Sequence, residues 1–348
     1  MPNDGPSGGR PYRGAIVGFG SVARAAHLPG FRYDAAIRRR IEIVAAVDTD
    51  PGAGDGVDIP VVPDWAALRG AAGAIDFVDI CTPTATHVRV TLEALAEGYH
   101  VLCEKPAAIT PAEARSVAAA AHAARRTVMP SHQYRFNPAW RQMRAWLDAG
   151  AIGHWHLAEV AVYRPAADGA GSAGVPWRGT RSGGVGGILL DHGTHMLYTL
   201  ADLAGVPTVV RAWTARLRHR AYDVEDTAQV VLEYPGRVAV VFLTWAAQHR
   251  ENRVRFIGEQ GTIEWTGGIL RLDAGSRTES LDMTAQLDKR MYPAWFAAQF
   301  AAFAQALDAG GTAEAPLADI ERVAVLIDAA YRAAECGTAV SLSGAGAV

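Results

Sequence analysis

GAIVGFGSVA, residues Gly14–Ala23, is the stretch that decides the fold. A short apolar run leads into the pattern G-x-G-x-x-A, and helix-forming residues follow it. In this pattern Gly18 permits a tight turn, Gly20 lets the backbone approach a pyrophosphate, and Ala23 lets a helix pack closely on the strand. The stretch therefore predicts a strand, a dinucleotide-binding turn and a helix. The other turn residues assigned to cofactor binding are Phe19, Ser21 and Val22.

An acid at the end of the next predicted strand supports this interpretation. The run Ile41–Asp48 is mostly apolar and ends in a carboxylate, with Thr49 beside it. A carboxylate at this position accepts hydrogen bonds from an adenosine ribose and repels a 2′-phosphate, so we predict NAD rather than NADP. The alternative is that Asp48 only begins the turn that runs to Pro51.

Strand-like and helix-like runs then alternate as far as residue 130. The strands are expected at 61–62, 75–81, 100–103 and 127–129, and the helices at 64–69, 86–97 and 111–125. This alternation predicts a parallel, doubly wound sheet, whose ligand lies beyond the carboxyl ends of the strands. Four segments should meet at that edge of the sheet: Gly18, Asp48, Thr82-Pro83 and Glu104-Lys105-Pro106.

One lysine at this edge stands out in the composition. The run VLCEKP, Val101–Pro106, contains Lys105, and the only other lysine is Lys289, against thirty-one arginines. Lysine, unlike arginine, can exchange a proton near neutral pH when burial or a nearby cation lowers its pKa. We therefore interpret Lys105 as a candidate proton-transferring group, the alternative being a surface lysine at a strand end.

The second half of the chain predicts a different sheet. Strand-like runs occur at 155–164, 208–217, 227–234, 238–245, 253–257 and 262–265 without intervening helices, and helices are expected at 293–307 and 317–335. Consecutive strands of this kind indicate a mostly antiparallel sheet, so the fold class is α/β plus α+β. The predicted domains are 12–130 for the dinucleotide and 131–340 for substrate binding and oligomerisation, after a disordered tail at 1–11.

Three tryptophans on the second sheet bear on assembly. Trp213, Trp245 and Trp265 give the sheet more apolar surface than its own helices are expected to cover. We therefore predict a homo-dimer or homo-tetramer that packs sheet to sheet. The alternative is that these tryptophans lie in the core of one protomer.

Composition excludes several classes of function. Half of the residues are hydrophobic and the net charge is −3, which is typical of a soluble globular protein. We find no apolar run of about 20 residues, no signal peptide in Met1–Pro11 and no basic run with interleaved aromatics, so we expect a cytoplasmic protein that binds neither membrane nor nucleic acid. Cys81, Cys103 and Cys336 are widely spaced and are expected to be buried free thiols, with no metal site.

A second candidate cluster joins a glycine-rich loop to a predicted helix. In GGVGGILLDHGTH, Gly183–His195, the residues Asp191 and His195 are four apart and share a helix face, while His192 points about 100° away. A carboxylate beside an imidazole is a general-base arrangement. The alternatives are a surface pair, a metal site with too few ligands and a buried structural histidine. The four glycines predict a close approach of backbone and ligand.

Five motifs in order resemble the glucose-fructose oxidoreductase and inositol dehydrogenase family (Gfo/Idh/MocA). They are Gly18-x-Gly20-x-x-Ala23, Thr82-Pro83 with His87, Glu104-Lys105-Pro106, Tyr134–Pro138 followed by Gly150-x-x-Gly153, and Asp191-x-x-x-His195. The resemblance runs from about Tyr12 to Ala334. It implies a Rossmann domain, an open-sheet domain, NAD or NADP, and hydride transfer on sugars, cyclitols or related polyols.

The resemblance also implies roles for individual residues. Lys105, Asp191 and His195 match the family's catalytic positions, and His192 stands where the family often has an apolar residue, which leaves its role open. The further residues assigned to the cofactor are Thr49, Cys81, Thr82, Pro83, His87, Glu104, Lys105, Gln133, Trp177 and Arg178. The residues assigned to the substrate are His132, Tyr134, Arg135, Asn137, Tyr163, Arg164, Asp191, His192 and His195.

The working hypothesis is an alcohol dehydrogenase for a sugar or polyol. His195 would accept the hydroxyl proton, Lys105 would bind the same oxygen, Asp191 would hold a neighbouring hydroxyl and bias the tautomer of His195, and Glu104 would anchor Lys105. The pocket arginines would also admit a carboxylate or phosphate, or pair with local acids. The rival functions are a glycosidase that uses NAD transiently and a regulator that binds NAD or a sugar without chemistry.

Overall fold

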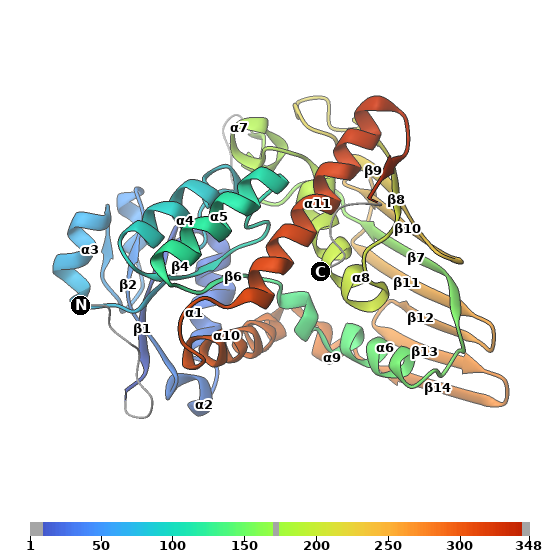
Figure 1. Cartoon of the computed structure of the whole chain (residues 1–348), viewed down its shortest axis with the longest axis horizontal. Helices are drawn as coiled ribbons and strands as arrows, with labels where there is room; N and C mark the ends of the chain where they lie inside the picture. Colours follow the sequence, from blue (N-terminus) through green and yellow to red (C-terminus); the bar gives the residue numbers. More distant parts are fainter. Residues whose placement is uncertain (1–9, 170–173, 343–348) are drawn as a thin grey trace. The chain divides into compact units, whose positions relative to one another are not determined.

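The computed structural model describes residues 10–169 and 174–342. It folds as two compact units, Met1–Phe136 with Lys289–Ala324, and Asn137–Asp288 with Val325–Val348. The blue-to-green and the green-to-orange parts of Figure 1 show that each unit is built on a sheet of its own. Among the described residues, no helix combines the length and the apolar character that crossing a membrane requires.

Six parallel strands form the sheet of the first unit, in the order β3-β2-β1-β4-β5-β6. This is the order of a doubly wound Rossmann sheet, and each strand expected from the sequence is present. The strands are β1 (Tyr12–Val17), β2 (Ile41–Val47), β3 (Val61–Val62), β4 (Phe77–Ile80), β5 (His100–Cys103) and β6 (Val128–Pro130).

Side-chain caps at Asp64 and Thr110 begin two of the connecting helices. Asp64 accepts a hydrogen bond from the Ala67 N–H at 2.8 Å, and Thr110 with Glu113 forms a reciprocal capping box. The helices of this unit are α1 (Leu28–Phe31), α2 (Ala35–Arg38), α3 (Trp65–Ala72), α4 (His87–Ala96), α5 (Pro111–Ala124) and α10 (Tyr292–Asp308).

Both faces of the first sheet are buried. Alternate side chains of β1 point to opposite faces, so Ala15 and Val17 enter one apolar cluster and Ile16 enters the other. The first cluster is closed by α3, α4 and α5. The second is closed by α1 and α10, where the rings of Phe31 and Phe300 stack with centroids 3.7 Å apart.

The position of α10 corrects the predicted domain assignment. We predicted that the helix at 293–307 belongs to the second domain, but in the structure Lys289–Ala324 is part of the first unit. Phe300, Phe303 and Leu307 of α10 are buried in the second apolar cluster of the Rossmann sheet. A parallel sheet needs helices on both faces, and this helix supplies one of them from far along the chain.

Nine strands form the sheet of the second unit, in the order β14-β13-β12-β11-β7-β10-β9-β8-β15. All neighbours are antiparallel except β7 and β10, so the predicted mostly antiparallel sheet is confirmed. The strands are β7 (Trp155–Tyr163), β8 (Val209–Ala215), β9 (Thr227–Tyr234), β10 (Arg237–Thr244), β11 (Glu251–Gly258), β12 (Thr262–Thr266), β13 (Ile269–Ala274), β14 (Arg277–Asp282) and β15 (Val340–Ser341).

The sequence missed strands β13, β14 and β15. Every second residue of β13 faces solvent, and the exposed positions include Arg271 and Asp273. β14 reads RTESLD, with Leu281 as its only apolar residue. As the polar end strand of the sheet, β14 carries too few apolar residues for the alternation to be seen.

The tryptophans divide between the two faces of the second sheet. Trp245 and Trp265 are 0% and 5% exposed, so for them the alternative of a core position is correct. Trp265 meets the edge of Trp140 on α6 (Pro138–Asp148), with centroids 6.2 Å apart. Trp213 is 50% exposed. Of the three tryptophans, Trp213 alone therefore contributes to the exposed apolar surface that we predicted on this sheet.

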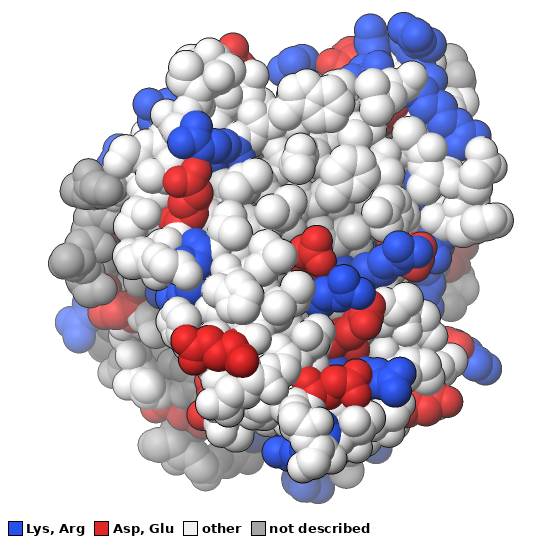
Figure 2. Space-filling view, turned by 90° about the vertical axis from the view of Figure 1, so that its right-hand side faces the viewer, with Lys and Arg blue, Asp and Glu red and all other residues white. Residues whose placement is uncertain are grey.

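The outer face of the second sheet carries none of the described helices, whereas α6 and α8 (Thr194–Ala204) lie on its inner face (Figure 1). Figure 2 looks onto the right-hand side of Figure 1 and shows uncharged surface bordered by charged side chains of both signs. An open depression lies on this outer face. It is lined by residues that include Ala161, Tyr163, Val240, Phe242, Arg253 and Glu264.

Helix α11 (Glu314–Cys336) begins in the first unit and ends in the second. Its presence confirms the helix expected at 317–335. Cys81 and Cys103 are buried free thiols, as predicted, but Cys336 is exposed because it is the last residue of this helix. The ends of the chain fall at positions that the structure does not describe, so the predicted disordered tail at 1–11 lies largely outside the described residues.

Candidate active site

The dinucleotide turn leaves open space where the sequence predicted it. Gly18 has φ +86°, and a Cβ there would lie 2.6 Å from the Thr82 nitrogen, so both conformation and packing require glycine. A Cβ on Gly20 would meet no atom within 4 Å. A π-helical turn, Ala23–His27, follows. The space above Gly20 fits the close approach of a pyrophosphate.

Asp48 is tied to the turn by its own hydrogen bonds. Its Oδ2 accepts from the Phe19 N–H at 2.6 Å, and its Oδ1 accepts from the Asp50 N–H at 2.9 Å. The alternative that Asp48 begins a turn is therefore realised. A carboxylate has about four acceptor positions, so these two bonds leave capacity for ribose hydroxyls.

His87 lies inside the first unit rather than on a binding surface. It is 2% exposed, with Nδ1 2.9 Å from the Pro106 carbonyl oxygen and Nε2 2.8 Å from the Thr82 carbonyl oxygen. Burial lowers its pKa, so the neutral ring donates to one carbonyl at a time. His87 therefore links the two loops at the carboxyl ends of β4 and β5.

Lys105 follows β5, and its backbone is held by the preceding residue. The Lys105 N–H donates to Oε2 of Glu104 at 3.2 Å, and the Glu104 N–H donates to the Ile80 carbonyl at 2.8 Å.

Cys81, which we assigned to the cofactor, is buried, with Sγ 3.3 Å from Nδ1 of His27. Thr82 and Gly18 lie against each other at the same sheet edge. The parallel order of β1, β4 and β5 is what brings these segments together.

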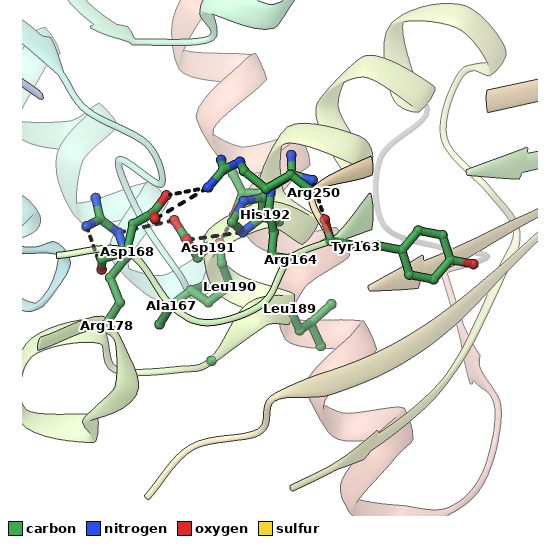
Figure 3. A network of polar contacts seen from close by, with 12 residues as sticks. Tyr163, Arg164, Ala167, Asp168, Arg178, Leu189, Leu190, Asp191, His192 and Arg250 are labelled. Atoms are coloured by element: carbon green, nitrogen blue, oxygen red, sulfur yellow. Dashed lines mark hydrogen bonds and ion pairs between the residues drawn. The ribbon is translucent and has the colours of Figure 1, made fainter. Parts of the chain in front are cut away.

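In the second unit, Asp191 lies between two cationic or basic groups, as Figure 3 shows. Its Oδ1 is 3.5 Å from Nε of Arg178, and its Oδ2 is 3.1 Å from Nδ1 of His192. The Arg178 guanidinium stacks on the ring of Trp177 at 4.1 Å and donates to the Asp168 carbonyl at 3.2 Å. Asp191 therefore belongs to a fixed polar network.

His195 is oriented by a partner that the sequence did not reveal. It is 6% exposed, and its Nδ1 lies 2.9 Å from the hydroxyl of Tyr198. The phenol of Tyr198 therefore engages Nδ1, while the predicted influence of Asp191 on the tautomer of His195 stays a prediction. The π-helical turn Leu189–Gly193 precedes α8, and such turns are frequent at functional sites.

The four glycines before Asp191 serve packing within the protein. A Cβ on Gly183 or Gly184 would lie under 3.0 Å from the carbonyl oxygens of Trp177 or Arg178. On Gly187 it would lie 1.8 Å from the Glu225 carbonyl oxygen. The close approach that we predicted between backbone and ligand is therefore an approach between two parts of the chain.

Glu225 and Tyr331 hold the glycine-rich loop before Asp191, and the sequence analysis did not identify either residue. Glu225 accepts from the Gly187 N–H at 3.0 Å, the Leu189 N–H at 3.2 Å and the Tyr331 hydroxyl at 2.8 Å. Burial raises the pKa of the Glu225 carboxyl above its ordinary value. No local pattern marks either residue, because their partners are far away in the chain.

Three residues assigned to the substrate pack within the first unit. Arg135 makes a bidentate ion pair with Asp319 of α11, and Nδ1 of His132 is 3.5 Å from the same carboxylate. Although burial opposes ionisation, His132 and Arg135 lower the pKa of Asp319 below its ordinary value. Tyr134 meets the edge of Trp295 on α10 at 6.1 Å. Gln133, assigned to the cofactor, is 6% exposed beside them.

Three more assigned residues have structural positions in the second unit. Asn137 is the N-cap of α6 and accepts from the Ala139 N–H at 2.8 Å. Arg164 is 6% exposed and donates to the carbonyls of Tyr163 and Glu251. Tyr163 itself lies on the outer face of the sheet, where it lines the depression. Their assignment to a substrate pocket finds no support in this geometry.

Two family models match most of the chain. Residues 12–132 match the oxidoreductase family with an NAD-binding Rossmann fold, and residues 140–264 match the GFO/IDH/MocA C-terminal domain. D-apiose dehydrogenase from Paraburkholderia graminis is 32% identical over 276 residues, which cover 77% of this chain and 69% of that protein.

Two solved structures share the fold over nearly the whole chain. An oxidoreductase from Agrobacterium radiobacter, in complex with NAD+, L-tartaric acid and magnesium, has a TM-score of 0.82 at 23% identity and covers 96% of this chain and 99% of its own. Levoglucosan dehydrogenase, in complex with NADH and levoglucosan, has a TM-score of 0.81 at 20% identity and covers 96% and 100%. At these identities the likeness establishes the fold.

Substitution by alanine should have different effects at Gly187, which is tightly packed, and at Gly20, which faces open space. Gly187→Ala places a Cβ against a backbone carbonyl and should lower the free energy of unfolding by about 2–3 kcal/mol. Gly20→Ala meets no protein atom, so stability should change by less than about 0.5 kcal/mol while the Kd for NAD rises on the order of tenfold. Denaturant unfolding and calorimetric titration measure both. Equal NAD affinity in Gly20→Ala and wild type would contradict the assignment of this turn.

Proposed function

This chain belongs to the Gfo/Idh/MocA family of NAD-binding oxidoreductases, and we propose that it is a dehydrogenase of a neutral sugar or related polyol. Oxidation of a CH–OH group is the chemistry of its dehydrogenase relatives. The observation that carries the proposal is the combination, in one chain, of an open dinucleotide turn at Gly20 with a buried His195 whose Nδ1 is engaged by Tyr198.

NAD, when bound, supplies the hydride acceptor. We assign its pyrophosphate to the turn Gly18–Val22 and its adenosine ribose to Asp48. The carboxylate of Asp48 favours NAD over NADP because it repels a 2′-phosphate. Its bond to the Phe19 N–H supports this, since it holds the carboxylate beside the turn.

His195 is the proposed general base. If its Nδ1–H donates to the Tyr198 oxygen, the lone pair lies on Nε2, which can accept the proton of a substrate hydroxyl. Lys105 is assigned to the same hydroxyl oxygen, where it stabilises developing negative charge and relays the proton. Asp191, held by Arg178 and His192, is assigned to a neighbouring hydroxyl.

The charge balance favours a neutral substrate. Arg135 is paired with Asp319, Arg164 with backbone carbonyls, and Arg178 with Asp191. A uronate or a nucleotide sugar would need an arginine that gives up such a partner. D-apiose dehydrogenase and levoglucosan dehydrogenase are named for neutral sugars, which supports the same class.

A cofactor and substrate screen tests this function. Calorimetry should show tighter binding of NAD than of NADP, and NADH absorbance should rise with at least one neutral aldose, anhydrosugar or cyclitol. Turnover restricted to uronates or tartrate-like acids would overturn the neutral class. Sugar release from a glycoside without net NADH would establish the glycosidase, and binding of NAD without turnover of any member would favour the regulator.

The substitution Lys105→Arg distinguishes the role of Lys105 in proton transfer from the role of its positive charge. Arginine keeps the positive charge and the donors but does not exchange a proton, so kcat should fall about 100-fold or more while the Kd for NAD stays within about twofold. Lys289→Arg is the matched control, because it changes the only other lysine. Near-normal kcat in Lys105→Arg would remove the proton role.

We further propose that the protein forms a homo-dimer or homo-tetramer through the outer face of the second sheet. Val240 and Phe242 lie in a depression of that face, flanked by Arg255, which pairs with Glu264 at 2.9 Å. Apolar centres with charged borders are typical of protein interfaces. Figure 2 shows both kinds of surface on this side.

Charge placed in the depression should dissociate the oligomer. Val240→Arg combined with Phe242→Arg should give the mass of one protomer in light scattering, because two copies cannot bury unpaired guanidiniums. Ser276→Arg, in the exposed turn between β13 and β14, should leave the oligomer intact. A wild-type protein that is monomeric at high concentration would contradict the assembly.

A further inference from the structure

A buried histidine connects the helix after the dinucleotide turn to the segment that carries Lys105. Nδ1 of His27 lies 2.7 Å from Oδ2 of Asp79, and Nε2 lies 3.0 Å from Oε1 of Glu104. The exposed fractions of the three residues are 0%, 0% and 7%. The three residues come from the helical turn after Gly20, from β4 and from the end of β5.

The contacts of His27 with Asp79 and Glu104 determine how many protons the three side chains share. A neutral imidazole has one N–H, so it can donate to only one of two carboxylates, and the other nitrogen would face an oxygen lone pair. Both contacts at hydrogen-bond length therefore require one additional proton. Burial is the largest single effect and opposes the charge on His27, but Asp79 and Cys81 together outweigh it and hold the pKa of His27 well above its ordinary range. His27 also lowers the pKa of Glu104, against the effect of burial.

Cys81 and two phenylalanines of α10 also pack around His27. Cys81 brings Sγ to 3.3 Å from Nδ1, and burial raises the pKa of this thiol, so it stays neutral. Phe296 and Phe300 of α10 cover the ring, with centroids at 4.4 and 5.6 Å. Lys105 is a further cation beside Glu104, and its charge favours the ionised form of this carboxylate.

The spacing distinguishes proton sharing from metal binding. His27, Asp79 and Cys81 form a compact set of possible metal ligands among the residues that the structure describes. Tetrahedral zinc with ligands at about 2.0–2.1 Å would hold nitrogen and oxygen about 3.3 Å apart. The observed 2.7 Å is shorter and matches a charge-assisted hydrogen bond. Nε2 is in addition engaged by Glu104.

The second oxygen of Glu104 carries the connection to Lys105. While Oε1 accepts from His27, Oε2 accepts from the Lys105 N–H at 3.2 Å. We propose that His27 is a positioning residue: as a buried imidazolium it joins Asp79 to Glu104 and fixes the Lys105 backbone relative to the dinucleotide turn. This deepens the proposed function, since it assumes that Lys105 serves the reaction. The structural part, a doubly protonated ring that holds Glu104, is independent of any substrate.

Nitrogen NMR of the wild-type protein tests the structural part without substrate. Both ring nitrogens of His27 should carry a proton at neutral pH, because the pKa of this buried ring lies well above its ordinary value. A singly protonated His27 at neutral pH would overturn the proposal. Stoichiometric zinc in the purified protein would also overturn it and assign a metal site instead.

His27→Gln tests the link to Lys105. The amide cannot carry charge, so the Lys105 backbone amide resonance should shift and kcat should fall about 10- to 100-fold, with the Kd for NAD within about threefold. Rates are taken well below the melting temperature, so that a purely structural role would leave kcat unchanged. His122→Gln is the control on the surface of α5.

Asp79→Asn provides a second variant if His27→Gln does not fold. It keeps the bond to Glu104 but removes the charge that holds the proton, so His27 should begin to titrate and kcat should fall by a smaller factor. Wild-type kcat in either folded variant would overturn the positioning role. If no substrate is found, the proposed function fails, while the NMR spectra of the wild-type and Asp79→Asn proteins still decide the state of His27.

Discussion

The first unit depends on covering both faces of a parallel sheet. Its strands are apolar on both sides, so the sheet is stable only where helices lie on each face. Helices α3, α4 and α5 close one face, and α10 closes the other with a row of phenylalanines. Because the strands are parallel, their carboxyl ends meet at one edge, and this brings together the turn at Gly18, the acid at Asp48 and the segment of Lys105.

Buried polar side chains then fix the loops at that edge. His87 joins the loops after β4 and β5, Asp48 holds the Phe19 N–H, and Glu104 holds the Lys105 N–H. In the second unit, Glu225 does the same for the loop that leads to Asp191. Each such hydrogen bond contributes about 1 kcal/mol, but leaving a buried group unpaired costs more, so these loops have few alternative conformations.

Within each unit, several cationic side chains are paired with acids of the same unit. Arg178 and His192 flank Asp191, Arg135 binds Asp319, and His27 lies between Asp79 and Glu104. Pairing of this kind lets charged groups remain ionised inside the protein. It also explains why residue types that suggested a substrate pocket in the sequence, such as Arg135 and His132, have structural partners instead.

The sequence by itself determined the features that depend on neighbouring residues. The G-x-G-x-x-A turn, the acid after β2, the alternation of strands and helices, and the two candidate groups at Lys105 and His195 are all local patterns. Only the tertiary structure decided that α10 covers the first sheet, that Tyr198 faces His195, and that glycines 183–187 pack against the chain itself. His27 is 52 residues from Asp79 and 77 from Glu104, and their contact follows from the register of parallel strands, which no local pattern encodes.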